Sequence, residues 1–404
     1  MKNRATIKDV ARLARVSIGT VSRVVNGNKA VTEENRLAVF DAIQRLGYRP
    51  SSIARSLVGQ TERARRGTPL PPGAPRLTAI GYVSIDHSIL TEEMPPAGSR
   101  VSAKLIHRSV GGPAANVAIA ASRLGGDFPV AVDLISSLGD DPESDWALAE
   151  LLECGLNVDA IERVTGGRLS RSVVIVEAGG RRTILNEPLS LPIPRIRDYF
   201  NAAAARQGQH CLHLEGFRVG LLDELHLTGA SRPDLVTIDT TGLPAHWQTP
   251  AAFGTLRRSC DFIFMSRSAA RQLVGTDVDD GELADTLSRH AADGGASIVL
   301  TMGASGSVLI QPGKAPVCVP ALAVDPVDVT GAGDTVIAAF GASLAAGHDF
   351  AHAARVANLA AGIVVGKLGT ATASPAELAR AILARHRAAL PDLSRLTVLV
   401  PTAA

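Results

Sequence analysis

The sequence predicts a multidomain protein with a small all-α head and a large α/β body. Over residues 1–58, apolar residues recur at helical spacing in three short segments. From Leu77 onward, short apolar runs such as "LVTIDTT" and "CDFIFMS" alternate with Ala- and Leu-rich helical stretches. This alternation indicates a mostly parallel sheet with helices on both faces. The 404 residues, 46% of them hydrophobic, are sufficient for such a body.

Charge divides the chain at the same place. Residues 1–66 hold 14 Lys and Arg against 5 Asp and Glu, whereas the remainder holds 27 against 34. A basic head on an acidic body predicts that only the head meets nucleic acid, with a solvated basic tail as the alternative. Residues 59–76 have the Pro, Gly and Arg content of a linker. We therefore expect domains at 1–58 and 77–390, and a tail at 391–404.

Cysteine usage and hydropathy exclude several classes of protein. The four cysteines lie far apart without CxxC spacing, which favours reduced thiols over disulfides or a zinc site. The N-terminus lacks the apolar segment of a leader, and no apolar run approaches the length of a membrane span. We therefore expect a cytoplasmic protein without a membrane partner.

The head has the pattern of three short helices with a tight turn between the first two. Val10, Leu13 and Ala14 are expected to form the inner face of the first helix. Ser17 is placed to cap the second helix, and Thr32 the third. This arrangement predicts a helix-turn-helix, with another three-helix fold as the alternative.

The stretches "DVARLARVSIGTVSRVVNG" and "LGYRPSSIARSL" resemble the head of the LacI family of DNA-binding regulators over about residues 1–58. The resemblance implies that the second helix enters the major groove of double-stranded operator DNA, and that 51–58 form a hinge helix rather than plain linker. Arg23 is expected to recognise guanine, because two N–H donors of its guanidinium match the O6 and N7 acceptors of that base. Gly19 departs from the longer side chain usual in the family, so readout there is expected to be weak. The implied DNA-binding residues are Ser17, Ile18, Gly19, Thr20, Ser22, Arg23 and, in the minor groove, Ala54 and Leu57.

The segment "DVTGAGDTVIAAF", residues 328–340, combines small residues, an acid and an apolar helix expected to begin at Asp334. The backbone N–H groups of Gly331, Ala332 and Gly333 are expected to converge on an anion, aided by the positive end of that helix. A carboxylate there is poor for binding phosphate but well placed to accept a proton from an attacking hydroxyl. Asp334 is therefore a candidate general base beside an anion hole. A capping Asp at an ordinary strand-to-helix turn is the alternative.

Four further stretches occur in order: "AIGYVSIDHS", "GGPAANVAIAASRLG", "SLGDDPESD" and "VLTMGASGSVLI". Together with "DVTGAGD" they resemble the PfkB family of carbohydrate kinases, which have a ribokinase-like fold, over about residues 77–390. The resemblance implies ATP and Mg²⁺, with a sugar or phosphosugar as the other ligand. It also implies a small β lid from 82–110 and 172–186 that often pairs between two subunits. A homodimer would suit a head that reads a palindrome.

The resemblance also assigns roles to single residues, each with a structural role in a turn or helix as the alternative. The sugar hydroxyls would be bound by Asp86, Gly112 and Asn116, beside the anion hole (Gly331, Ala332, Gly333) and the base Asp334. The nucleotide would lie against Thr301, Gly303, Gly306 and Asn358, and Asp328 would lie near a possible monovalent-cation (K⁺) site.

One family motif is missing. After "CDFIFM" the family usually carries N-x-x-E, which supports magnesium and phosphate; this chain has Ser266, Arg267, Ser268 and Ala269. Losing such support costs about 10–100-fold in metal affinity or activity. Two functions remain open: a DNA-binding transcriptional regulator with a sugar-, phosphosugar- or nucleotide-sensing kinase domain, or an ATP-dependent sugar kinase with an accessory DNA-binding head. A chance fusion with an inert body is a third.

Overall fold

The computed structural model contains two compact units, Met1–Arg65 and Arg66–Ala404, which we describe separately. The hinge residues Ala54 and Leu57 and most of the expected linker lie outside the described residues. The described residues are 7–25, 32, 35, 38–39, 42, 73–125, 128–177, 181–193, 196, 199–200, 208–224, 232–275, 278–367 and 370–389.

The first unit contains the expected pair of short helices, α1 (Ile7–Leu13) and α2 (Ile18–Val25). Val10 of α1 and Val21 of α2 are fully buried and form a small core with Val39 and Ala42. The prediction for Leu13 was wrong, because its side chain is 43% exposed. Leu13 is the last residue of α1, and its side chain lies outside the core to which Val10 and Ala14 belong.

Side-chain caps start the second and third helical segments of this unit, as predicted. The Ser17 hydroxyl accepts a hydrogen bond from the Thr20 N–H at 3.0 Å. The Thr32 hydroxyl accepts one from the Asn35 N–H at 3.4 Å, and Asn35 is itself helical. A capping oxygen satisfies an N–H group that has no partner inside the helix. The turn between α1 and α2 places Arg15 in the left-handed region, with φ at 54°.

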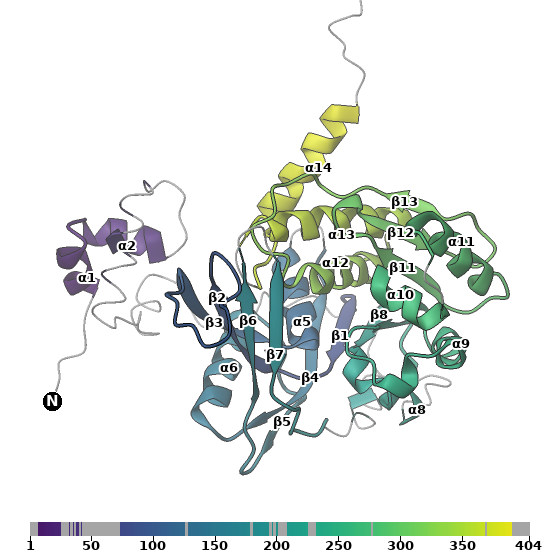
Figure 1. Cartoon of the computed structure of the whole chain (residues 1–404), viewed down its shortest axis with the longest axis horizontal. Coiled ribbons are helices and arrows are strands. Elements are labelled where there is room, and N and C mark those ends of the chain that lie inside the picture. Colours follow the sequence, from purple (N-terminus) through teal and green to yellow (C-terminus); the bar gives the residue numbers. More distant parts are fainter. Residues whose placement is uncertain are drawn as a thin grey trace, which may run out of the picture. The chain divides into compact units, whose positions relative to one another are not determined.

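The second unit is built on a nine-stranded sheet (Figure 1). Six consecutive neighbour pairs, from β11 through to β5, are parallel, whereas β12 and β13 add antiparallel strands at one edge. The order in space is β13 (Val317–Val319), β12 (Ser307–Ile310), β11 (Ser297–Thr301), β10 (Phe262–Ser266), β9 (Leu235–Asp239), β8 (His210–Leu214), β1 (Arg76–Ile80), β4 (Ala131–Gly139) and β5 (Ile161–Val164).

Helices cover both faces of this sheet, as the alternating pattern predicted. Successive strand residues point to opposite faces, so Phe262 and Phe264 join one core while Ile263 and Met265 join the other. No helix in the described ranges is long and apolar enough to cross a membrane. The first core is covered by α5 (Pro113–Leu124), α6 (Pro142–Glu153), α12 (Ala332–Ala345), α13 (Phe350–Val365) and α14 (Pro375–Ala389), and the second by α8 (Leu221–Glu224), α9 (Pro250–Ser259), α10 (Arg267–Val274) and α11 (Asp280–Ala291).

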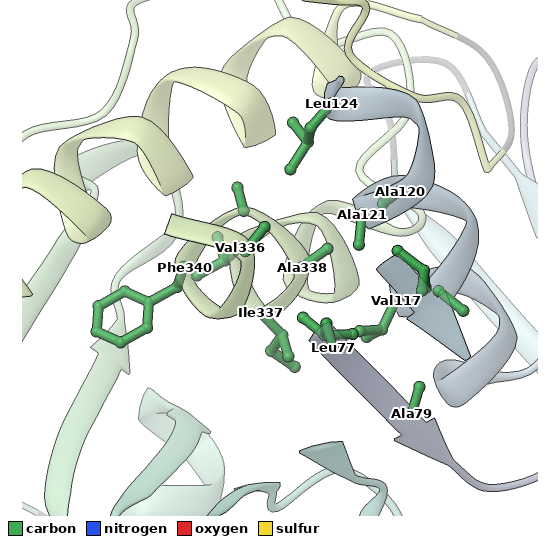
Figure 2. Packing of buried hydrophobic residues seen from close by; sticks show 14 of the residues in the cluster. Leu77, Ala79, Val117, Ala120, Ala121, Leu124, Val336, Ile337, Ala338 and Phe340 are labelled. Atoms are coloured by element: carbon green, nitrogen blue, oxygen red, sulfur yellow. The ribbon is translucent and has the colours of Figure 1, made fainter. Parts of the chain in front are cut away.

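The helix α12 lies at the centre of the first core. Figure 2 shows Ile337 and Ala338 of α12 close to Leu77 of β1 and to Val117 of α5. A Cβ on Gly341 would come within 2.8 Å of the Leu77 side chain, so the glycine allows this close approach of helix and strand. This packing fixes the first turn of α12 at the edge of the sheet.

A separate four-stranded sheet, which we call the lid, accompanies the large sheet (Figure 1). The expectation of a β lid from residues 82–110 and 172–186 is therefore confirmed. Its strands are, in spatial order, β3 (Leu105–Gly111), β2 (Ser84–Leu90), β6 (Ser170–Val176) and β7 (Arg182–Asn186).

Candidate functional site

The first turn of α12 carries the candidate base. The helix begins at Ala332, two residues before the predicted start at Asp334. Gly331 explains the difference, because its φ of 74° lets the chain turn into the helix earlier than other residues would. Asp334 is partly buried in this first turn, where backbone N–H groups have no partner inside the helix. A Cβ on Gly333 would meet no atom within 4 Å, so there is open space beside these N–H groups.

Asn116 connects α5 to this turn. Its Nδ2 donates a hydrogen bond to Oδ2 of Asp334 at 2.8 Å, across 218 residues of sequence. Its Oδ1 is buried and has no hydrogen-bond partner among the described residues. Gly112 starts α5 with φ at 98°, and a Cβ there would lie 2.4 Å from the carbonyl oxygen of Tyr82. The structure thus brings Asn116 and Asp334 together and leaves the amide oxygen of Asn116 without a partner among the described residues.

Asp86 extends from the lid strand β2. It is 7% exposed, and its Oδ1 accepts a hydrogen bond from the Ser84 hydroxyl at 2.9 Å. A Cβ on Gly111 would lie 2.1 Å from the Asp86 carboxyl group, so a glycine is needed at that position. Burial raises the pKa of Asp86, and hydrogen bonds from Ser84 and Ser172 oppose that rise.

Glu215 is a buried acid at the site that the sequence prediction missed. It directly follows β8 and accepts hydrogen bonds from the N–H groups of Tyr82, at 3.0 Å, and Ala114, at 3.3 Å. Burial raises its pKa to about 8. Glycine is required at Gly81, where a Cβ would lie 2.1 Å from the Glu215 carboxyl. A glutamate directly after the buried strand "CLHL" was the available signal, because ligands bind at the carboxyl ends of parallel strands.

Three charged side chains, those of Asp86, Arg182 and Asp239, shift the pKa of Asp334. The pKa of Asp334 is raised to about 7, chiefly by burial and also by the carboxylates of Asp239 and Asp86. The hydrogen bond from Asn116 and the positive charge of Arg182 lower it. Asp239 ends β9 and Arg182 begins the lid strand β7, and neither was predicted as a site residue. A general base works best when its pKa is near the working pH, so this value suits a proton acceptor.

The residues predicted to bind nucleotide lie near β11, β12 and β13, at one edge of the nine-stranded sheet. Gly303 and Gly306 form the turn after β11, with φ at 60° and 98°. A Cβ on Gly306 would lie 2.1 Å from the carbonyl oxygen of Val319. Asn358 of α13 is buried, and its Nδ2 donates to that same oxygen at 2.6 Å. The structure brings Gly306 and Asn358 together around Val319, while no hydrogen bond in the described part of the chain joins them to Asp334.

Thr301 and the residues at the missing motif occupy the neighbouring strand ends. Thr301 ends β11 and pairs with Ser266, which ends β10. The Ser266 hydroxyl accepts a hydrogen bond from the Ala269 N–H at 3.3 Å and so caps α10. Ala269 has no side-chain ligand atom. Ser266 and Ala269 therefore lack the amide and carboxylate groups that would support a magnesium ion at this place.

Asp328, predicted to lie near a monovalent cation, is fully buried. Its Oδ1 accepts a hydrogen bond from the Thr330 N–H at 2.8 Å, two residues along the chain. Among the described residues, no group of three or more His, Cys, Asp or Glu side chains is placed to hold a metal ion. A K⁺ ion at Asp328 stays a prediction.

The predicted DNA-contacting residues fall partly within the first unit's described region. Ile18 begins α2 and is 46% exposed, and Gly19 next to it is also exposed. The backbones of Ser22 and Arg23 lie in α2, but their side chains are outside the described residues. The exposed start of α2 carries Ile18 and Gly19, two of the residues predicted to contact DNA.

The mostly parallel sheet covered by helices, together with the lid, gives the body a ribokinase-like fold. Residues 74–377 match the model of the pfkB family carbohydrate kinases, and the chain belongs to this family. Residues 6–51 match the model of the bacterial regulatory proteins of the lacI family, so the head is a LacI-family domain. The family expectations for both parts are confirmed.

Individual relatives agree with this assignment. The chain is 34% identical over 275 residues to the bifunctional protein HldE of Azotobacter vinelandii, a match that covers 67% of this chain and 55% of the relative. The chain thus spans about half the length of the curated relatives it matches. Among solved structures, ribokinase from Cryptococcus neoformans in complex with ADP has a TM-score of 0.62 at 20% identity, covering 76% of this chain and 99% of that chain. Arabidopsis thaliana ribokinase complexed with ribose and ATP gives 0.60 at 22%, with the same coverage. At these identities the likeness shows the fold.

Proposed function

We propose that the body binds a sugar and ATP and transfers the terminal phosphoryl group to a sugar hydroxyl, with Asp334 as the general base. The observation that carries this proposal is the hydrogen bond between Asn116 and Asp334 at the first turn of α12. The pairing orients the carboxylate beside open space in front of Gly333. A base with a pKa of about 7 in such a place can remove a proton from an attacking hydroxyl.

In this proposal the sugar lies between the lid and the first turn of α12. Asp86 accepts hydrogen bonds from sugar hydroxyls, and the unpartnered Oδ1 of Asn116 accepts another. Gly112 allows the close approach of the chain to the ligand. The proton of the attacking hydroxyl passes to Asp334 as the oxygen–phosphorus bond forms, and ADP leaves.

The backbone N–H groups of Gly331 and Gly333 stabilise the charge on the transferring phosphoryl group, whereas the Ala332 N–H donates to the carbonyl oxygen of Val329 at 3.3 Å. A helix N-terminus provides both free donors and the positive end of the dipole. Donors that are already in position stabilise the transition state more than the ground state, because negative charge develops in the transition state. The residues at the end of β10 do not supply the amide and carboxylate that would support a magnesium ion.

We further propose that the protein is a transcriptional regulator, with the LacI-family head binding operator DNA and the body acting as its sensor. The excess of positive charge in residues 1–66 supports DNA binding by the head alone. A ligand alters DNA affinity only by its differential affinity for two states of the protein, and lid closure on the sugar is the proposed two-state element. The alternative is a sugar kinase in which the DNA-binding head is accessory.

The proposed regulator acts as a homodimer, because a helix-turn-helix reads two half-sites of a palindrome. The lid offers a surface for a second copy. Ile106 on β3 and Leu185 on β7 are 64% and 54% exposed. By strand register they share one face of the lid, opposite to the face that carries Asp86. Apolar side chains at both edge strands of one face favour burial against an identical lid.

The test is ADP release from ATP across a panel of sugars, phosphosugars and nucleosides, with Asp334→Asn as the control. We expect sugar-dependent turnover that the substitution lowers by about 10²–10⁴-fold. The rate should rise with pH and level off above about pH 7, where Asp334 is deprotonated. Turnover unchanged in Asp334→Asn would refute the assigned base.

The sensor role has its own test. Operator affinity is measured by fluorescence anisotropy with and without the ligand that the panel identifies. No turnover, but a ligand that stabilises the protein against heat and changes operator affinity, would favour the sensor over the kinase. Operator affinity unchanged by every sugar, phosphosugar and nucleotide would refute the sensor.

A further inference from the structure

Arg267 takes a defined position at the edge of the proposed nucleotide site. It directly follows Ser266, which ends β10 and pairs with Thr301 at the end of β11. Arg267 and the glycine turn after β11 therefore start from adjacent points on the carboxyl edge of the sheet. The Nη2 atom of Arg267 lies 3.8 Å from the place where a Cβ on Gly303 would be. Its Nη1 donates to Oδ2 of Asp280 at 2.9 Å, which orients the guanidinium.

The residues around Arg267 offer a cation but no metal ligands. The hydroxyls of Ser266 and Ser268 are 3.0 Å apart and hydrogen-bond to each other. Ser266 also caps α10 by accepting from Ala269, whose own side chain is a methyl group. Arg267 therefore lies in the sequence between Ser266 and Ala269, the two positions where a metal-supporting amide and carboxylate would be expected. In phosphoryl transfer the metal ion normally neutralises the charge of the phosphate oxygens.

We propose that Arg267 binds the polyphosphate of a nucleoside di- or triphosphate directly, so that nucleotide binding by this chain does not depend on a divalent metal ion. The inference deepens the proposed function and rests on its nucleotide site. The planar guanidinium presents a fork of N–H donors that matches two phosphate oxygens at once. The absence of a side chain on Gly303 leaves room for the phosphates to reach it.

The ion pair with Asp280 does not prevent this exchange of partners. Arg267 and Asp280 are 44% and 41% exposed, and ion pairs between exposed side chains contribute little net stability. The other oxygen of Asp280 accepts a hydrogen bond from Nη2 of Arg271 at 2.9 Å. When Arg267 turns to a phosphate, Asp280 therefore keeps a cationic partner.

The experiment is isothermal titration calorimetry of the full chain with ADP and with adenosine, in EDTA and in Mg²⁺. The variants are Arg267→Ala and Arg267→Lys. The matched control is Arg271→Ala, which removes a cation from the same helix and from the same carboxylate. Melting temperatures verify that each variant is folded.

We expect the unmodified chain to bind ADP about equally in EDTA and in Mg²⁺. Arg267→Ala should weaken ADP binding in EDTA by about 10–100-fold, the range of a charge-assisted hydrogen bond, and leave adenosine binding unchanged. Arg267→Lys should restore part of the affinity, since it keeps the charge but loses the fork. Arg271→Ala should bind ADP like the unmodified chain.

Two results would overturn the inference while leaving the nucleotide site intact: ADP binding that requires Mg²⁺, or Arg267→Ala that binds ADP in EDTA as tightly as the unmodified chain. Equal losses for ADP and adenosine would assign Arg267 a structural role and would also overturn it. An unmodified chain that binds neither ADP nor adenosine in either buffer refutes the proposed nucleotide site itself.

Discussion

Replacing Asp334 by asparagine should stabilise the protein, and the gain should depend on pH. The carboxyl has a pKa of about 7 in the folded protein, against an ordinary value of 3.8. A carboxyl group whose pKa is raised by folding destabilises the folded state at any pH where the group is ionised in the unfolded chain. The penalty is absent below about pH 4, grows as pH rises towards 7, and stays constant above that. Asparagine carries no charge at any pH, so the variant escapes the penalty.

The size of the effect follows from the two pKa values. Each pH unit between them corresponds to about 1.4 kcal/mol, so the full penalty above pH 7 approaches about 4 kcal/mol. The Asp334 side chain retains some solvent access, so we expect the gain in free energy of unfolding to be about 1–3 kcal/mol. The carbonyl oxygen of the new amide can still accept the hydrogen bond from Asn116, so that contact is retained.

The assay is thermal unfolding of both proteins between pH 4 and pH 8. We expect melting temperatures that nearly coincide at pH 4 and differ by several degrees at pH 8, with the variant higher. Asp159→Asn is the control, because it removes an exposed carboxylate from a turn remote from the site and should shift neither curve. A variant that is equally or less stable than the unmodified chain at pH 8 would refute the raised pKa of Asp334.

Four further changes test other parts of the molecule. Gly333→Ala should leave the melting temperature unchanged or higher yet lower sugar-dependent ADP release, because a methyl group there meets no protein atom and would stand in the anion hole. Gly306→Ala, its counterpart in the other glycine turn, should unfold at lower temperature, since its φ is 98° and the Cβ would lie 2.1 Å from a carbonyl oxygen; matching melting curves would contradict this. Glu215→Ala should destabilise the fold by about 1–3 kcal/mol per buried N–H group left without an acceptor, measured by urea unfolding at pH 7. Arg23→Ala should lose specific operator binding but keep most salt-dependent binding to random DNA in anisotropy titrations, and equal losses on both DNAs would refute its role as a base reader.

The sequence by itself determined the local features of this protein. The alternation of apolar strands and helices indicated a mostly parallel sheet, because neighbouring strand residues must bury side chains on opposite faces. Ser17 and Thr32 marked helix starts, since a hydroxyl next to a helical run satisfies an otherwise unpaired N–H group. The resemblance to the PfkB family then placed Asp334 and Asn116 in one site, which the hydrogen bond between them fits.

Only the tertiary structure decided which distant groups share that site. The sequence analysis assigned no role to Glu215, Asp239 or Arg182, and the fold places them where they interact with the carboxylates of the site. Leu13 had the right spacing for the core of the head, but its side chain is exposed. Spacing along one element predicts which face a side chain lies on, whereas burial and charge depend on the elements packed against that face. The pKa of Asp334 is therefore a property of the whole fold, set by groups more than 90 residues away in sequence.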